Sequence, residues 1–188
     1  MSDSIIRPPQ NVLPKLKLPR KVELDPRCEG VHKVLGLCLR PLWENSSIQV
    51  AQVPLLPNFE KALILALHTR QLEPGLENID RLLDNEQKGL TALREKQGAA
   101  PAHRVSRLLI IANDGSERFY RAVESTLRRH SDRVLILQVD VPSSRLVQKL
   151  YGEERAIKAL LVSERDGVSQ ILLSLVGQAI PDSESEHK

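Results

Sequence analysis

Aromatic residues are scarce in this chain, at 3% of its 188 residues, and tryptophan occurs once. A hydrophobic core must therefore consist of leucine, isoleucine, valine and alanine, and a hydrophobic content of 41% suffices for one domain of ordinary size. No apolar run approaches the roughly 20 residues of a membrane helix, and the N-terminus lacks the apolar segment of a secretory signal. These absences predict a soluble, intracellular protein.

Sequence signatures of metal sites and of catalysis are also missing. The two cysteines, Cys28 and Cys38, do not form a CxxC pair, and the five histidines are scattered. Neither a phosphate-binding loop, nor a dinucleotide fingerprint, nor a nucleophile elbow is present. We therefore expect a non-catalytic protein with no metal and no cofactor.

Charge is nearly balanced, with 27 basic and 24 acidic residues and a net charge of +3, which permits a nucleic-acid partner without requiring one. Proline and basic residues are concentrated at the N-terminus, where residues 1–27 hold five of the twelve prolines. Proline at this density predicts an extended basic arm over residues 1–29. Two interpretations are open: a disordered tail, or an arm that becomes ordered along RNA or a partner subunit.

The hydrophobic pattern predicts an α/β fold. Residues 30–57 read as an extension, with a helix that ends near Arg40 and then a short edge strand or loop. Asn58 is a good N-cap for a helix, and a second helix follows Gly75. Three buried strands (107–112, 133–141 and 156–163) then alternate with helices, the last of which has Val168, Ile171, Leu172 and Leu175 inward. This alternation predicts a three-layer α-β-α sandwich with a small, mainly parallel sheet.

We place this α/β domain at residues 58–178, with a polar insertion at 84–106 and a disordered tail at 179–188. Within the domain, "LLIIANDGSERFYRAVESTL" resembles the start of universal stress domains, where an Asp-Gly-Ser turn precedes a helix. A phosphate would bind the free N–H groups of such a helix start, and the residues involved would be Asp114 and Ser116. The same residue types also serve turns and helix caps, which is the plainer interpretation.

A second resemblance covers about two thirds of the chain. The features that carry it are the glycine-started helix "PGLENIDRLL", the strand and acidic turn "LLIIANDGSE", the strand and turn "LILQVDVPSSRL", and "LVQKLYGEE" before "AIKALLVS". In this order they resemble the kink-turn RNA-binding superfamily. It includes an archaeal large-subunit ribosomal protein, the snoRNP and spliceosomal core proteins, and an RNase P/MRP accessory subunit.

The resemblance implies an RNA-binding site at the glycine-started helix, where the superfamily carries the motif G-x-N-E-x-x-K. Gly75 matches the glycine and Arg81 the basic residue, while Glu77 and Asn78 occupy the Asn-Glu positions in reversed order. Free N–H groups at the helix start attract phosphate, and the polar side chains read base edges. The reversed order alters the exact base readout. The alternative role of these residues is helix capping.

Other basic residues extend the predicted RNA surface. Arg118 and Arg121 lie on the outer face of the helix that begins near Ser116, and Arg128 continues the same stripe. Arg104 lies in a basic cluster just before the first buried strand. Trp43 fits a core position better than an anchor for a partner protein.

Together these patterns predict a non-catalytic RNA-binding subunit of a ribonucleoprotein, which binds structured RNA and other subunits and no membrane. The basic N-terminal extension, the insertion and the altered motif favour the RNase P/MRP accessory type, which acts in tRNA and rRNA processing. In a eukaryote such a protein is nuclear or nucleolar. The alternatives are a protein-interaction module on the same fold and a nucleotide-binding domain of the stress type.

Overall fold

Aliphatic strands form the centre of the molecule. The structure, a computed structural model, describes residues 17–98, 103–152 and 157–177. Within them, six strands form one sheet in the order β1-β2-β5-β4-β6-β3. The strands are β1 (Leu39–Pro41), β2 (Gln49–Val53), β3 (Leu72–Pro74), β4 (Arg107–Ala112), β5 (Val134–Val139) and β6 (Ala159–Val162). The helices are α1 (Arg20–Glu23), α2 (Cys28–Leu37), α3 (Pro57–His68), α4 (Leu76–Gln97), α5 (Glu117–His130), α6 (Ser143–Tyr151) and α7 (Arg165–Ser174).

Strand direction differs between the centre and the edges of the sheet. Strands β2, β5 and β4 are parallel, and the connection from β4 to β5 crosses over through α5. Strands β1, β6 and β3 run antiparallel to their neighbours. The expected mainly parallel sheet therefore applies to its centre only, and the sheet as a whole is mixed.

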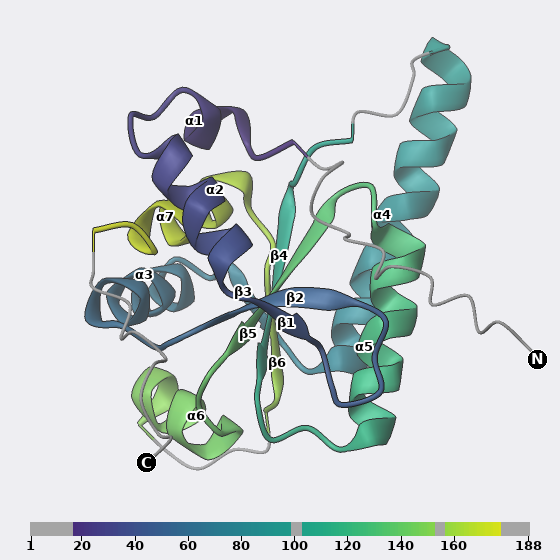
Figure 1. The fold of residues 1–188 in the computed structure, drawn as a ribbon. Coiled ribbons are helices and arrows are strands. Elements are labelled where there is room, and N and C mark those ends of the chain that lie inside the picture. The colour runs from purple at the N-terminus through teal and green to yellow at the C-terminus, as the bar shows by residue number, and fades with distance from the viewer. Residues whose placement is uncertain (1–16, 99–102, 153–156, 178–188) are drawn as a thin grey trace, which may run out of the picture.

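Helices cover both faces of this sheet (Figure 1), which confirms the α-β-α sandwich. Successive residues of a strand point to opposite faces. Accordingly, Leu108 and Ile110 belong to one buried cluster, with residues of α1, α2, α3, α6 and α7. Leu109 and Ile111 belong to a second cluster, with residues of α4 and α5.

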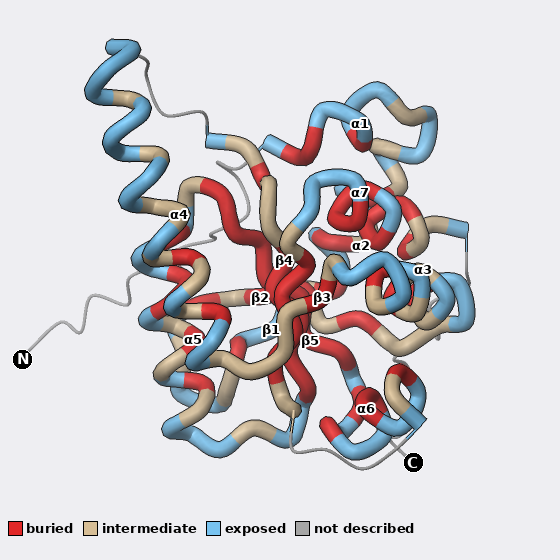
Figure 2. Tube along the Cα trace, turned by 180° about the vertical axis from the view of Figure 1, so that it is seen from behind, coloured by how far each residue is buried: buried red, intermediate tan, exposed pale blue. Residues whose placement is uncertain are grey.

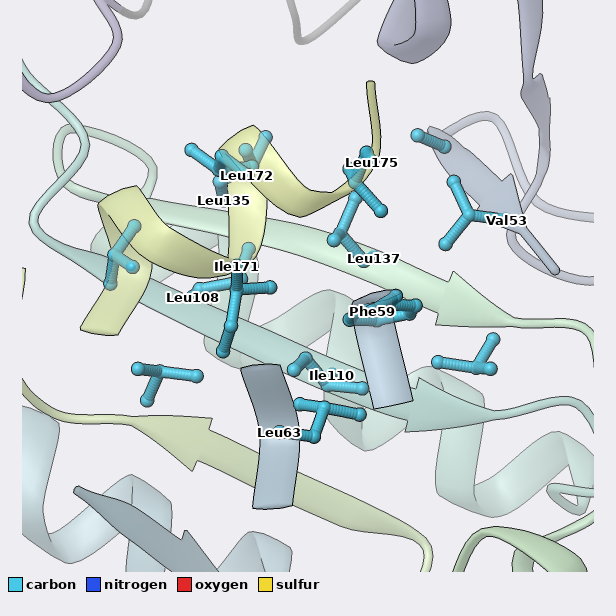
Figure 3. Packing of buried hydrophobic residues seen from close by; sticks show 14 of the residues in the cluster. Val53, Phe59, Leu63, Leu108, Ile110, Leu135, Leu137, Ile171, Leu172 and Leu175 are labelled. Atoms are coloured by element: carbon cyan, nitrogen blue, oxygen red, sulfur yellow. The ribbon is translucent and has the colours of Figure 1, made fainter. Parts of the chain in front are cut away.

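The larger cluster is mainly aliphatic, as the composition requires, with Phe59 as its buried aromatic residue. Figure 3 shows Phe59 and Leu63 of α3 beside Ile110, with Ile171 of α7 close by. All four side chains are completely buried. Each contributes about 1.5–3 kcal/mol of hydrophobic stabilisation. The inward residues predicted for the last helix (Val168, Ile171, Leu172 and Leu175) are buried, as expected.

Residues 17–29 correct the prediction of an extended arm. Leu18 and Val22 are buried in the larger cluster, and Lys17 N–H donates to His103 O at 3.1 Å. Proline does not prevent helix α1, because Pro19 lies just before its first turn, where a missing N–H costs no helical hydrogen bond. The rest of the predicted arm, residues 1–16, and the predicted tail at 179–188 lie outside the described residues.

Two further predicted boundaries are wrong. Residues 30–57 are not a separate extension, because β1 and β2 pair within the same sheet as β5. The start of the polar segment 84–106 is helical, because α4 continues to Gln97 and ends at Gly98, whose φ of 61° closes the helix. Figure 2 shows that the distal turns of α4 are exposed, so polar composition there reflects a solvated continuation of the helix rather than an insertion.

Helix starts follow local chemistry. Ser116 caps α5 as predicted, since its hydroxyl accepts from Phe119 N–H at 3.3 Å. Helix α3 begins at Pro57 instead of after Asn58, because proline is well suited to the first helical position.

In the described part of the chain, no helix has both the length and the apolar character that crossing a membrane demands.

Candidate nucleic-acid interface

Four segments converge at one end of the sheet. Ala112, the last residue of β4, pairs with the last residue of β5, and Ile111 pairs with Ala159 at the start of β6. Antiparallel pairing with β6 brings the end of β3 to the same place, because Pro74 pairs with Leu160. We name this end the Gly75 edge; it consists of residues 75–81, 113–116, 140–143 and Lys158.

Gly75 gives the Gly75 edge its open helix start. Its φ of 88° and ψ of 123° lie where side chains other than glycine are strained. Its N–H donates to Ala159 O at 2.9 Å, and its carbonyl accepts from Ile79 N–H at 3.0 Å. No side chain caps the helix, and the next three N–H groups (residues 76–78) have no acceptor among the described residues. Such a helix start attracts anions.

The polar residues of the predicted motif lie on the exposed first turns of α4. Arg81 donates to the side-chain oxygen of Asn78, and Asn78 Nδ2 lies 3.5 Å from Pro74 O. Glu77 is exposed and has no ion pair within the described segments. Asp80 points to α5 instead, where it accepts from Thr126 and pairs with Arg129 at 3.0 Å. The structure therefore brings together Gly75, Glu77, Asn78 and Arg81, as the sequence predicted.

The two turns beside this helix start are held by their own hydrogen bonds. Asn113 Nδ2 donates to Asp140 Oδ1 at 2.9 Å. The Asp114 carboxylate accepts from Ser143 N–H at 3.0 Å and from its hydroxyl at 2.7 Å, so it caps α6. Burial acts to raise the pKa of Asp114, but the hydrogen bonds from Ser143 outweigh it and the pKa is lowered. Both residues of the nucleotide-binding alternative, Asp114 and Ser116, thus serve helix starts.

On α5 the predicted basic stripe is only partly free. Arg118 and Arg121 are both exposed near the start of the helix. Arg121 pairs with Glu117 at 2.6 Å, and its guanidinium lies 5.5 Å from the centre of the Trp43 ring. Trp43 is half-buried and donates to Glu124 at 3.0 Å, so it attaches the β1–β2 hairpin to α5. Arg118, with no ion pair to any described residue, is the more available cation.

Arg104 corrects the predicted site. It donates to Leu18 O and pairs with Glu23 at 2.6 Å. Arg104 precedes β4, whereas the Gly75 edge follows that strand, so the length of β4 separates the two. The prediction that Arg104 contributes to this surface is therefore wrong.

Sequence reasoning missed Lys158. Its ammonium group donates to Asp114 O at 2.8 Å, which places a cation at the Gly75 edge. The position of Lys158 follows from the antiparallel pairing of β6 with β4, because the residue before β6 then lies beside the end of β4. Sequence alone indicated parallel strands, and parallel strands would have put Lys158 at the opposite end.

Comparisons with known proteins add little to this geometry. Neither a family model nor a curated protein matches the chain. A solved structure described as a protein with unknown function from Bacillus halodurans C is similar, with a TM-score of 0.45 and 19% identity. The match covers 64% of this chain and 97% of that chain. Similarity at this level shows nothing about function.

Proposed function

We propose that the protein is a non-catalytic RNA-binding subunit of a ribonucleoprotein and that it holds a kinked RNA at the Gly75 edge. The observation that carries the proposal is the open start of α4. Three N–H groups there have no acceptor among the described residues, and Asn78 and Arg81 are exposed within the first two turns. Backbone N–H groups position a phosphate, and side chains of this kind contact base edges and the backbone.

The charges around this helix start support an anionic partner. Lys158 and Arg118 lie on neighbouring segments, and Arg81 lies on α4 itself. Arg129 pairs with Asp80, and Lys158 lies close enough to help lower the pKa of Asp114, so both carboxylates have a cation nearby, whereas among the described residues Asp140 accepts only from the neutral side chain of Asn113. Glu77 remains as an exposed carboxylate there. We assign it to a base amino group rather than to a phosphate, because a carboxylate accepts from such donors.

The kind of assembly is part of the proposal. The resemblance to the kink-turn superfamily, together with the altered motif, favours an accessory subunit of the RNase P/MRP type. In a eukaryotic cell we expect such a protein in the nucleus and nucleolus. Sequencing of the RNA that copurifies with the tagged full-length chain tests this assignment. Recovery of unrelated RNAs in equal amounts would contradict it.

Filter binding with a kink-turn RNA tests the surface. We expect Arg81→Glu and Asn78→Ala each to weaken binding on the order of tenfold, which corresponds to about 1.4 kcal/mol. Arg165→Glu is the matched control: this arginine is exposed and follows β6, at the opposite end of the sheet from Gly75. Its binding should equal that of the wild type. Unchanged binding in both test variants would exclude the Gly75 edge.

A second candidate function rests on a different surface. A groove of about 610 Å³ lies beside the distal half of α4, with Leu90, Leu93, Arg107 and Glu164 among its lining residues. Leu93 is 49% exposed. Exposed leucines along a groove are typical of protein-binding surfaces, so a protein-interaction module is the alternative. Copurification of stoichiometric protein without RNA, after nuclease treatment, would favour this alternative.

A further inference from the structure

Three buried side-chain atoms lie where α4 meets the end of α5 and have no hydrogen-bond partner among the described residues. They are Gln87 Oε1, His130 Nδ1 and Arg133 Nε. His130 and Arg133 are only 1% and 4% exposed. Buried polar atoms in folded proteins are nearly always paired with protein or with ordered water. Each of these three atoms, on neighbouring residues, therefore calls for a partner.

Existing hydrogen bonds hold the His130 and Arg133 side chains against one turn of α4. His130 Nε2 lies 3.0 Å from Asp84 Oδ1, and Arg133 donates to Leu83 O at 2.8 Å. Gln87 follows Leu83 and Asp84 by four and three positions, so it is a neighbour of each on the surface of α4. His130 and Arg133 are also linked directly, because Arg133 N–H donates to His130 O at 3.1 Å.

The donor and acceptor character of each atom follows from its surroundings. Because His130 Nε2 faces the Asp84 carboxylate, that nitrogen carries the proton. Burial, assisted by the charge of Arg133, lowers the pKa of His130 and keeps the ring neutral. Nδ1 is then an acceptor. Gln87 Oε1 is a second acceptor, and Arg133 Nε–H is a donor.

We propose that one buried water molecule binds here, accepting from Arg133 Nε–H and donating to Gln87 Oε1 and His130 Nδ1. One donor and two acceptors match the two protons and the lone pairs of water. An anion is disfavoured, because two of the three atoms repel it. This water joins α4 to the segment before β5. The link holds α4, whose first residues belong to the Gly75 edge, against the sheet. The inference does not depend on RNA binding.

A crystal structure of the full-length chain tests the site directly. We expect a single ordered water at hydrogen-bonding distance, about 2.7–3.2 Å, from all three atoms. A side chain or a non-water ligand in that position would overturn the proposal. So would a water bound to Arg133 alone, because His130 and Gln87 would then remain unexplained.

Nuclear magnetic resonance of the histidine nitrogens gives an independent test in solution. The proposal requires that His130 Nδ1 is unprotonated and hydrogen-bonded at neutral pH, with the proton on Nε2. A proton on Nδ1 would overturn it.

A pair of substitutions measures the stability that the water supplies. Gln87→Met keeps the length of the side chain but removes one acceptor. We expect it to raise the unfolding equilibrium constant roughly tenfold, because a buried hydrogen bond is lost. Gln97→Met is the control, because Gln97 is exposed near the end of the same helix. Equal effects of the two substitutions would show that Gln87 makes no such bond.

Discussion

Glu86 of α4 accepts a hydrogen bond of 2.5 Å from Arg133, which lies 47 positions later in the chain. The same carboxylate accepts from Arg107 at 2.8 Å. Arg107 begins β4, and Arg133 immediately precedes β5. A single carboxylate thus pairs with two cations at adjacent strand starts and joins α4 to the sheet. The Arg133 side chain is only 5% exposed, so this contact replaces part of the hydration that its charge loses on burial.

We expect Glu86→Gln to lower the free energy of unfolding by about 2 kcal/mol. Removal of one partner leaves a buried arginine without its counter-charge, and such losses cost about 3–5 kcal/mol when both groups are fully buried. The value is smaller here because the Glu86 side chain is 28% exposed. Urea unfolding gives the measurement. Glu95→Gln, an exposed change on the same helix, should stay within about 0.5 kcal/mol of the wild type. Equal midpoints for the two variants would refute this role of Glu86.

Two glycines of the α4 region should respond to alanine with opposite signs. Gly75→Ala introduces a side chain at a φ of 88° and should destabilise the protein by about 1 kcal/mol or more. Crowding is not the cause, because the nearest atom to an added Cβ is Asn78 Nδ2 at 4.0 Å. Gly89→Ala, in the middle of the helix and with open space around an added Cβ, should stabilise by about 0.5–1 kcal/mol. Thermal unfolding of both variants tests the pair, and a stabilising Gly75→Ala would contradict the strained conformation.

Strong local signals in the sequence correctly located the centre of the fold. The runs that became β4, β5 and β6 are almost entirely aliphatic, and strands buried on both faces have this composition. Ser116 was identified as a cap because its hydroxyl satisfies a helix N–H whatever the surroundings. The exposed residues at the start of α4 followed from the same kind of local chemistry.

Features that depend on distant partners were not predictable. Strands β1 and β3 have three residues each and exist because β2 and β6 pair with them. The direction of β6 determines which basic residues gather at the Gly75 edge. It brings Lys158 there, while Arg104 belongs to the opposite end. No local pattern encodes strand direction, so the membership of the site was only partly foreseeable.

Salt dependence gives a test of phosphate contact that follows from the proposed function. The measurement is the slope of log Kd against log salt concentration. We expect this slope to be smaller by about one for Arg81→Gln than for the wild type, because binding of the variant displaces one fewer cation from the RNA. Arg165→Gln should keep the wild-type slope. A lower affinity with an unchanged slope in Arg81→Gln would mean that this residue contacts bases or supports Asn78 rather than meeting a phosphate.

Acid should destabilise the protein through His130. Burial, reinforced by the positive charges of Arg133 and Arg129, lowers the pKa of His130 below 6.5, although Asp84 opposes the shift. Below pH 6.5 the unfolded chain binds a proton that the folded protein resists, so stability is complete above that pH and falls as the pH approaches the lowered pKa. The slope is at most about 1.4 kcal/mol per pH unit.

Urea unfolding between about pH 7.5 and 5.5 isolates this effect, since carboxylates titrate mainly below that window. The lowered pKa of Glu86 moves its own contribution further into acid, because the hydrogen bonds from Arg107 and Arg133 outweigh the effect of burial. We expect His130→Gln to flatten the pH dependence in this window. His68→Gln, at an exposed position at the end of α3, should keep the wild-type slope. If both variants keep that slope, another group is responsible for the loss of stability in acid, and the neutral ring required for the buried water loses its thermodynamic support.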